Sequence, residues 1–199
     1  MKRLSLAVLS ALACLPSAQA DVVPTIDLLP SSGNVAGAPG SVVGWGFTLT
    51  FTASSDWVVL TGSEFTGSQV FGTYVDYLSL PSAPLYVAGP SPESSTVTAP
   101  WNNSSIPPIG VGEFDINSTA LPGARIAGDI VVHYSLFSQD PNDPNFDPDT
   151  STVVADATVS DAVRINVTAT PEPSVLLPLA TVLGAILVLG QRFRRARPS

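Results

Sequence analysis

The densest group of side chains that could do chemistry is the run 139–150, QDPNDPNFDPDT. Its four carboxylates belong to Asp140, Asp143, Asp147 and Asp149, and two Asn amides lie between them. Such oxygens are the ligands that calcium prefers. The glycine and the alternate-residue spacing of an EF-type loop are missing, however, and Asp-Pro steps commonly form turns. Two interpretations stay open, a calcium site and an acidic hairpin loop.

The single histidine, His133, lies in the apolar segment IVVHY at 130–134. The sequence holds no second histidine, and its only cysteine is Cys14, so a usual zinc site or a Ser-His pair with an elbow motif is not expected. We predict that His133 faces solvent or a sheet edge. A carboxylate pair could assemble from distant positions, but no spacing favours one, so we predict no enzyme and no cofactor other than the possible calcium.

Three tryptophans could form a stacking platform for sugars. Trp45 alternates with apolar residues and is predicted to be buried. Trp101, in the sequence APWNN, is the one we expect to be exposed, and Trp57 follows a turn at 54–56. The platform is the alternative to ordinary core packing.

The elements that position these residues are predicted to be strands. The chain has 19 Pro, 15 Gly and only 12% charged residues, a composition that disfavours helices. Apolar and polar residues alternate over 41–51 and 69–80, and with 57–60 these segments predict an antiparallel meander. Residues 81–108 are rich in proline and are predicted to be a long connection with at most one short strand, near 96–98.

Four further strands are predicted, over 112–116, 125–137, 152–155 and 162–168. About eight strands with regularly spaced turns predict an all-β fold, a single antiparallel two-sheet sandwich that is immunoglobulin-like. We expect this β-sandwich domain to span 21–169. Between 21 and 170, fifteen acidic residues face only Arg125 and Arg164, a formal charge of −13. A surface of this charge repels nucleic acid.

Residues 1–20 have the pattern of a secretory signal peptide: Lys2 and Arg3, then an apolar stretch, then small residues. Ala18 and Ala20 occupy the positions that a signal peptidase reads, which predicts cleavage before Asp21. A lipoprotein signal using Cys14 is the alternative, although Ala11 stands where a Leu-like residue is required. The mature protein is then exported and has no disulfide.

At the other end, 175–190 is an uncharged apolar stretch, predicted to form a short transmembrane helix of about 24 Å. A cluster of bases follows it: Arg192, Arg194, Arg195 and Arg197. Such a cluster acts as a stop signal that stays cytoplasmic, which places the acidic domain outside. A plain membrane anchor with a Pro-rich hinge is one alternative for this region.

The tail 170–199 as a whole resembles the PEP-CTERM sorting domain of Gram-negative exported proteins. Pro171, Glu172 and Pro173, the apolar helix and the arginine cluster follow one another in the order of that family. The resemblance implies that an exosortase-like processing enzyme recognises Pro171–Pro173, and that the protein accompanies exopolysaccharide or biofilm production. It implies an inner-membrane-anchored precursor and then a place on the cell surface or in the extracellular matrix.

Two functions follow as hypotheses. The first is a structural or adhesive protein of the cell surface or matrix. The second is a glycan-binding or carbohydrate-active module acting on the same exopolysaccharide. A cleft lined by Trp101 with a close carboxylate pair would favour the second, and a smooth acidic sandwich would favour the first. We prefer the first.

Overall fold

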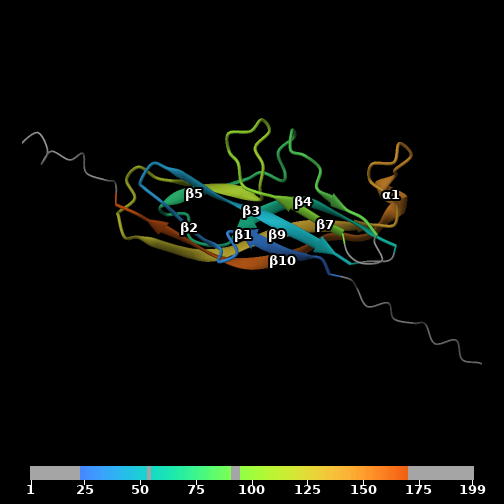
Figure 1. The fold of residues 1–199 in the computed structure, drawn as a ribbon, viewed down its shortest axis with the longest axis horizontal. Coiled ribbons are helices and arrows are strands. Elements are labelled where there is room, and N and C mark those ends of the chain that lie inside the picture. Colours follow the sequence, from blue (N-terminus) through green and yellow to red (C-terminus); the bar gives the residue numbers. More distant parts are fainter. Residues whose placement is uncertain (1–22, 53–54, 91–94, 170–199) are drawn as a thin grey trace, which may run out of the picture.

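The computed structural model describes residues 23–52, 55–90 and 95–169, which form two packed β-sheets (Figure 1). Three predicted sites lie outside this part of the chain: the signal cleavage site at Ala18, Ala20 and Asp21, the sorting motif Pro171–Pro173, and the stop signal at 192–197. So does the predicted helix 175–190. No helix within the described residues is long and apolar enough to cross a membrane.

The first sheet has five strands, in the order β1-β3-β8-β5, with β7 also paired to β3. All its pairs are antiparallel. Its strands are β1 Thr25–Leu29, β3 Val42–Phe51, β5 Gly72–Asp76, β7 Ser95–Ala99 and β8 Gly112–Ile116. The second sheet has the order β2-β10-β9-β4-β6. Its strands are β2 Asn34–Gly37, β4 Trp57–Phe65, β6 Val87–Ala88, β9 Arg125–Phe137 and β10 Thr152–Val167.

The core lies between the inner faces of the two sheets. On β3 every second residue from Val43 to Phe51 is buried, and Trp45 is fully enclosed, with its indole N–H donating to the Gly33 carbonyl at 2.9 Å. The second sheet contributes alternate residues of β9 from Ile126 to Leu136. The alternation from which the strands were predicted therefore also identifies which face of each strand is buried. The burial of Trp45 is confirmed.

Several predicted strands match closely: 41–51 is β3, which begins one residue later, and 112–116 and 125–137 are β8 and β9. The meander prediction was wrong, because β3 and β5 lie in one sheet and β4 lies in the other. The predicted strand 69–80 shrinks to β5, and the segments 152–155 and 162–168 are parts of one continuous strand, β10. Alternation does not reveal which sheet a strand joins, since that depends on its partners.

The prediction of a purely antiparallel sandwich was also wrong in one place, because β2 pairs with β10 in parallel, from Asn34 beside Arg164 to Gly37 beside Val167. After a turn at 30–33, the chain passes from β1 in the first sheet to β2 in the second and heads toward the same end of the molecule as β10 (Figure 1). Strands β1, β2 and β6 were not predicted, and 81–108 holds two short strands rather than one.

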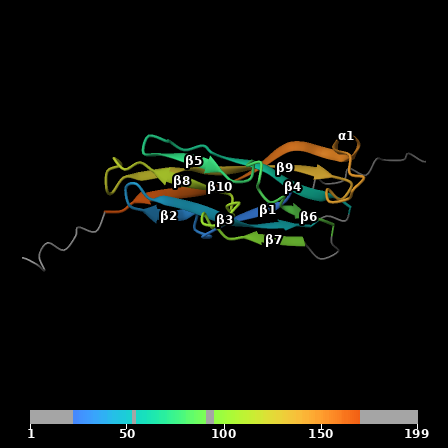
Figure 2. The same cartoon turned by 90° about the horizontal axis from the view of Figure 1, so that it is seen from above.

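The sandwich has two distinct ends along its long axis. Strand β10 ends at Val167, beside β2, while the helix α1 (Pro148–Ser151) and the loop before it lie at the opposite end; both views agree (Figures 1 and 2). The described chain therefore continues toward the tail 170–199 from the end remote from the acidic run. Two loops project from the side of the sandwich, between these ends (Figure 1).

Candidate functional site

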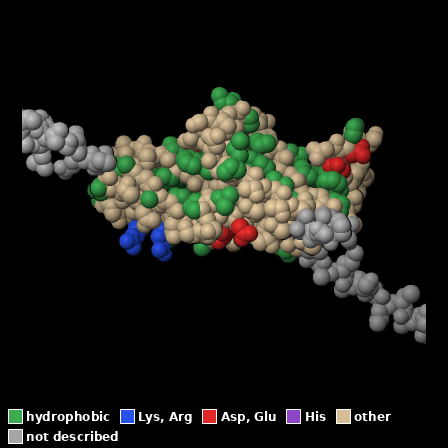
Figure 3. Space-filling model, viewed as in Figure 1, with side chains coloured by type: hydrophobic (Ala, Val, Ile, Leu, Met, Phe, Trp, Pro, Cys, Tyr) green, Lys and Arg blue, Asp and Glu red, His purple; other side chains and the backbone are tan. Residues whose placement is uncertain are grey.

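The two projecting segments, 77–86 and 100–110, are called the loop pair below. Neither segment contains a charged residue, although the domain carries fifteen acids. Ile106 at the tip of the second loop is 99% exposed, and Leu85 in the first is 57% exposed. Figure 3 shows hydrophobic side chains gathered over this side of the molecule, up to the tip that projects furthest. Exposed apolar patches on a soluble domain commonly mark binding surfaces.

The second loop arises where β3 changes partner. Residues 42–45 of β3 pair with β8 and residues 47–51 pair with β7 on the same edge, so the chain between β7 and β8 must leave the sheet. The loop is closed by reciprocal hydrogen bonds between the backbones of Asn102 and Ile109, at 2.9 and 3.0 Å. This closure gives the tip a fixed base.

Two glycines of β3 let this loop lie directly on the sheet. A Cβ on Gly44 would stand 2.2 Å from Nε1 of Trp101, and one on Gly46 would stand 2.5 Å from the Ala99 carbonyl oxygen. Trp101 therefore packs against bare backbone. We predicted that Trp101 is exposed, and this was wrong in part: the side chain is half-buried and its N–H is fully enclosed. Only part of its ring can meet a ligand.

A cluster of buried and half-buried polar groups, the polar seam, joins the loop pair to both sheets. It consists of Ser63 on β4, Tyr74 and Asp76 on β5, and the carbonyl of Val111. The Ser63 hydroxyl lies 2.6 Å from Asp76 Oδ1 and 2.8 Å from both the Tyr74 hydroxyl and the Val111 oxygen. Asp76 Oδ1 also accepts from the Leu78 N–H at 2.8 Å. One carboxylate therefore holds the start of the first loop to the opposite sheet.

The seam continues through Val111 to the second loop. The Val111 carbonyl accepts from the Tyr77 N–H at 3.2 Å, and its own N–H donates to the Trp45 carbonyl at 2.9 Å. On the outer side, the Tyr77 hydroxyl donates to Glu113 of β8. Burial, and then this bond to Glu113, raise the pKa of Tyr77. Burial likewise raises the pKa of Tyr74, although its bond with Ser63 opposes the shift. Both phenols are neutral donors at physiological pH.

Two buried polar groups of the loop pair, the Trp101 indole N–H and the Tyr86 hydroxyl, make no well-aligned hydrogen bond within the described part of the chain. The Tyr77 hydroxyl nevertheless lies near the first and the Gly110 backbone near the second. Tyr86 packs edge-on against Phe47, with ring centroids 4.9 Å apart, and burial raises the pKa of its hydroxyl. Buried donors are usually paired, often with ordered water.

The acidic run, 139–151, is a hairpin loop between β9 and β10, called the acidic loop below. Its aspartates serve the loop itself. Asp140 Oδ1 accepts from the Asn142 N–H at 2.9 Å, Asp143 Oδ1 from the Asn145 N–H at 2.8 Å, and Asp147 Oδ1 from the Asp149 N–H at 3.0 Å. The last of these caps α1. Asp149 lies in the first turn of α1.

The acidic loop is fastened to the sandwich by Phe146, whose ring meets Phe137 edge-on at 5.1 Å, and by the Ser138 N–H, which donates to Ser151 at 2.8 Å. The residues that the structure describes contain no group of three His, Cys, Asp or Glu arranged to hold a metal ion. The hairpin-loop interpretation is therefore the one that the geometry favours, and calcium binding stays an untested prediction.

His133 faces solvent from the outer face of the second sheet, as predicted, on the inner strand β9 rather than at an edge. Its Nδ1 lies 2.8 Å from Asp156 Oδ1, and its Nε2 lies 4.0 Å from Glu64 Oε1. Asp156 has a φ of 50° at an irregularity of β10. Exposed pairs of this kind contribute little to stability.

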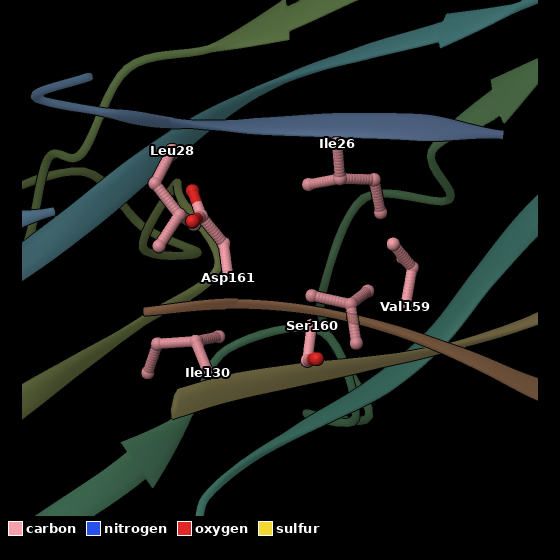
Figure 4. Close-up of a pocket in the computed structure, with 7 residues that line it drawn as sticks. Ile26, Leu28, Ile130, Val159, Ser160 and Asp161 are labelled. Atoms are coloured by element: carbon pink, nitrogen blue, oxygen red, sulfur yellow. The ribbon is translucent and has the colours of Figure 1, made fainter. Parts of the chain in front are cut away.

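Figure 4 shows a narrow slot between β1 and the β9–β10 sheet. Ile26, Leu28 and Ile130 line it, and it is too narrow to admit a water molecule. The carboxylate of Asp161 points into it beside Leu28 (Figure 4). From residue 152 to 163, β10 has no strand on this edge among the described residues. An inward-pointing charge at a free edge deters pairing with another chain. We therefore interpret Asp161 as protecting this edge from association, and the slot beside it is not a ligand site.

Apart from Trp101, the residues of the loop pair and of the seam were not predicted from the sequence. Asp76 was placed inside a long predicted strand, and Leu85 and Ile106 were placed in an unspecified connection. A usable signal was present: 77–92 and 94–112 carry no charge in a very acidic chain, and the pattern Gly44-Trp45-Gly46 exposes bare backbone on one face of a strand. Ser63 gave no signal, because it follows a register shift in β4.

No family model matches the sequence, and no curated protein is similar enough to match it. Two solved structures resemble it weakly. One is the sixth cohesin of scaffoldin B from Acetivibrio cellulolyticus, in complex with a Cel5 dockerin: 17% identity, 73% of this chain and 98% of that one, TM-score 0.23. The other is a family 123 glycoside hydrolase from Clostridium perfringens: 15% identity, 70% of this chain and 23% of that one, TM-score 0.24. Neither TM-score reaches the level of a shared fold.

Proposed function

We propose that this protein is an exported structural or adhesive protein of the cell surface or matrix, and that the loop pair is its contact surface. The observation that carries the proposal is an uncharged surface with an exposed apolar tip, Ile106, on a domain with a formal charge of −13. Acidic faces repel the anionic polymers and surfaces found outside cells. The loop pair is the surface that can approach them without that repulsion.

The polar seam supports the same proposal. Loops that must order themselves on binding lose affinity, because fixing their side chains and backbone costs conformational entropy. The hydrogen bonds of Asp76, Ser63 and Val111 hold both loops to the sheets before any partner arrives. A rigid contact surface needs no catalytic group, and we propose no enzymatic activity.

Adhesion is tested by the retention of the full chain on extracellular matrix from the producing cells. Replacing Leu85 and Ile106 with Ser together should weaken retention at least about tenfold, because two exposed aliphatic side chains are lost from the contact. The matched control replaces Val70 and Val153, which are 74% and 51% exposed outside the loop pair. Equal retention of the two double variants would contradict the proposal.

We further propose that the tail 170–199 is a sorting signal, processed by an exosortase-like enzyme after membrane insertion through 175–190. The order of the three parts of the tail supports this. The test is mass spectrometry of the C-terminus of the protein from cell fractions. Replacing Pro171, Glu172 and Pro173 with Ala should retain the tail in the inner membrane, whereas replacing the flanking Thr170 and Ser174 should not. If the unchanged protein keeps its tail in the inner membrane, the tail is a membrane anchor and not a cleaved sorting signal.

An immunoglobulin-like topology belongs to this proposal as well. Among the described strands, the order β1-β3-β8-β5 faces β10-β9-β4, which is the order A-B-E-D facing G-F-C of an immunoglobulin domain. Strands β6 and β7 are then additions between the fourth and fifth strands. They are also the strands that flank the loop pair, so the additions and the proposed contact surface coincide.

Glycan binding is the second candidate, and Trp101 favours it. Its half-buried ring adjoins the exposed amides of Asn102 and Asn103, and aromatic faces beside neutral polar groups suit sugars. Titration of the full chain with matrix oligosaccharides, followed by tryptophan fluorescence, separates the candidates. A saturable change that Trp101→Phe abolishes would favour glycan binding. No change, with matrix retention intact, would favour adhesion without a sugar site.

A further inference from the structure

Two exposed arginines lie together at the end of the sandwich where β10 ends. Arg125 on β9 stands opposite Asn166 of β10, and Arg164 stands opposite Ala127, so the two arginines are diagonal neighbours on the outer face of the second sheet. Figure 3 shows their side chains side by side. They are the only Lys or Arg residues between positions 4 and 191.

Neither arginine has a counterion within the described chain. The ion pairs found there all involve His133, and neither guanidinium makes a hydrogen bond. The nearest carboxylate by register is that of Asp129, opposite Ala162, and it forms no ion pair with Arg164. Like charges on neighbouring strands are unfavourable, and surplus acids were available as partners. Such a placement leaves both guanidinium groups free for an anion from outside the domain.

A polar cleft adjoins Arg164. It has a volume of about 240 Å³, and Ser32, Asn34 and Arg164 contribute its polar side chains. Asn34 lies beside Arg164 in the parallel β2–β10 pair. A guanidinium with an amide and a hydroxyl is a donor set that suits a phosphate oxygen. Arg125, Arg164, Ser32 and Asn34 are called the arginine end below.

The tail leaves the domain at this same end. Asn166, opposite Arg125, is three residues before Ala169, where the description ends. From Ala169 to the predicted helix at 175 is six residues, which span at most about 20 Å. The acidic loop lies at the other end of β10, whose 16 residues extend over roughly 50 Å, far beyond a Debye length of about 10 Å. Its charge is not felt at the arginine end.

We infer that the arginine end binds the anionic phosphate headgroups of the membrane into which the tail inserts, and so holds the domain end-on with the acidic loop pointing away. This inference rests on the proposed membrane segment. The two guanidinium groups supply the attraction, and the Asn34 and Ser32 side chains complete the contact with one phosphate. The contact seats an acidic domain on an anionic surface that would otherwise repel it.

The test uses the chain from Asp21 to Ser199, which is the predicted mature protein and contains no cysteine, reconstituted in phosphatidylcholine vesicles with or without about one third phosphatidylglycerol. A dye on Ser118→Cys reports proximity to an acceptor lipid, because Ser118 lies next to Gly40 at this end of the domain. We expect stronger energy transfer in the anionic vesicles. Replacing Arg125 and Arg164 with Gln should lower the ratio of docked to undocked domains about 25-fold, at about fivefold per arginine.

The matched control adds Asp143→Asn and Asp149→Asn to the double Gln variant, which restores the net charge at the far end of the molecule. Loss of docking in this variant supports the arginine end, and wild-type docking in it overturns the inference. Equal energy transfer in the neutral and the anionic vesicles also overturns it, because the attraction is then not to anionic headgroups. Flotation with neutral vesicles measures membrane insertion by the tail without the anionic contact. Failure of the proposed membrane segment is therefore distinguished from failure of docking by the arginine end.

Discussion

The acidic loop and the loop pair are held in different ways. In the acidic loop, each of three aspartates bonds to the backbone two residues further on, so the loop holds its own shape. The loop pair uses the same local bond at Asp76, which accepts from the Leu78 N–H, and at Asn102, which accepts from the Ser104 N–H. Asp76 differs because it also bonds to Ser63 on the other sheet, so the loop pair, unlike the acidic loop, depends on how the two sheets meet. Substitutions in the acidic loop should therefore destabilise the protein little. Substitutions at the anchor of the loop pair should also disturb the packing of the two sheets.

The largest effect is expected from Asp76→Ala. The substitution removes the acceptor of the Leu78 N–H and one of the two acceptors within reach of the Ser63 hydroxyl, so the free energy of unfolding should fall by about 1–3 kcal/mol. Asp149→Ala, the same change in the acidic loop, should cost less than about 0.5 kcal/mol. Urea unfolding measures both. Similar losses of unfolding free energy in Asp76→Ala and Asp149→Ala would contradict the difference between the two regions.

Gly44→Ala should cost about 1–3 kcal/mol, because the new methyl group overlaps the Trp101 ring and forces the second loop off the sheet. Tryptophan emission should shift to longer wavelength as Trp101 meets water. The control is Gly123→Ala, whose Cβ would meet nothing, although its φ of 87° makes that change strained too. If Gly44→Ala leaves the emission unchanged, the loop is not held by this contact.

Alkaline pH should weaken the seam. The pKa of Tyr74 is raised on folding, so its contribution is complete below the unfolded value of about 10 and is lost as pH rises toward the folded pKa. Tyr74 alone should lower the free energy of unfolding by up to about 1.4 kcal/mol per pH unit above 10, and Tyr77 and Tyr86, whose pKa values are also raised, act in the same direction. Tyr74→Phe should flatten this fall in urea titrations from pH 8 to 11. An equally steep fall in the variant would exclude Tyr74 as its source.

In the acidic loop, Asp147→Ala should cost about 1 kcal/mol, because it removes the cap of α1. Asp147→Asn keeps an acceptor oxygen and should cost less. Thermal melting distinguishes the two variants. Because the cap is local, the emission of Trp101 should not change in either variant. It is obtained by difference from the same variants with Trp101→Phe, because Trp57 lies opposite Phe137, on which the acidic loop packs. A change in the Trp101 emission would mean that the acidic loop communicates with the loop pair.

The smallest effect is expected from calcium. The three turn-forming aspartates already use one oxygen each on their own backbone, so calcium should leave the melting temperature of the full chain unchanged. Calorimetric titration gives an independent measure. Heat that disappears in the Asp147→Asn, Asp149→Asn variant would instead establish a calcium site and reverse the interpretation of this loop.

The part of the fold predictable from the sequence is the part that depends on near neighbours along the chain. Alternation placed β8 and β9 at their observed bounds and put Trp45 in the core. It failed for β5, since a strand ends where its partner ends, and β5 can be no longer than β8. The short strands β2 and β6 have four and two residues, too few to show a period.

The sequence by itself determined an all-β chain, the acidic loop with its Asp-Pro turns, and a solvent-facing His133, because each depends on residues within a few positions of one another. Only the tertiary structure decided the partner change on β3, the seam from Ser63 to Asp76, and the meeting of Arg125 with Arg164. These contacts join residues far apart in sequence. Their positions follow from how two sheets pack, and no local pattern encodes that packing.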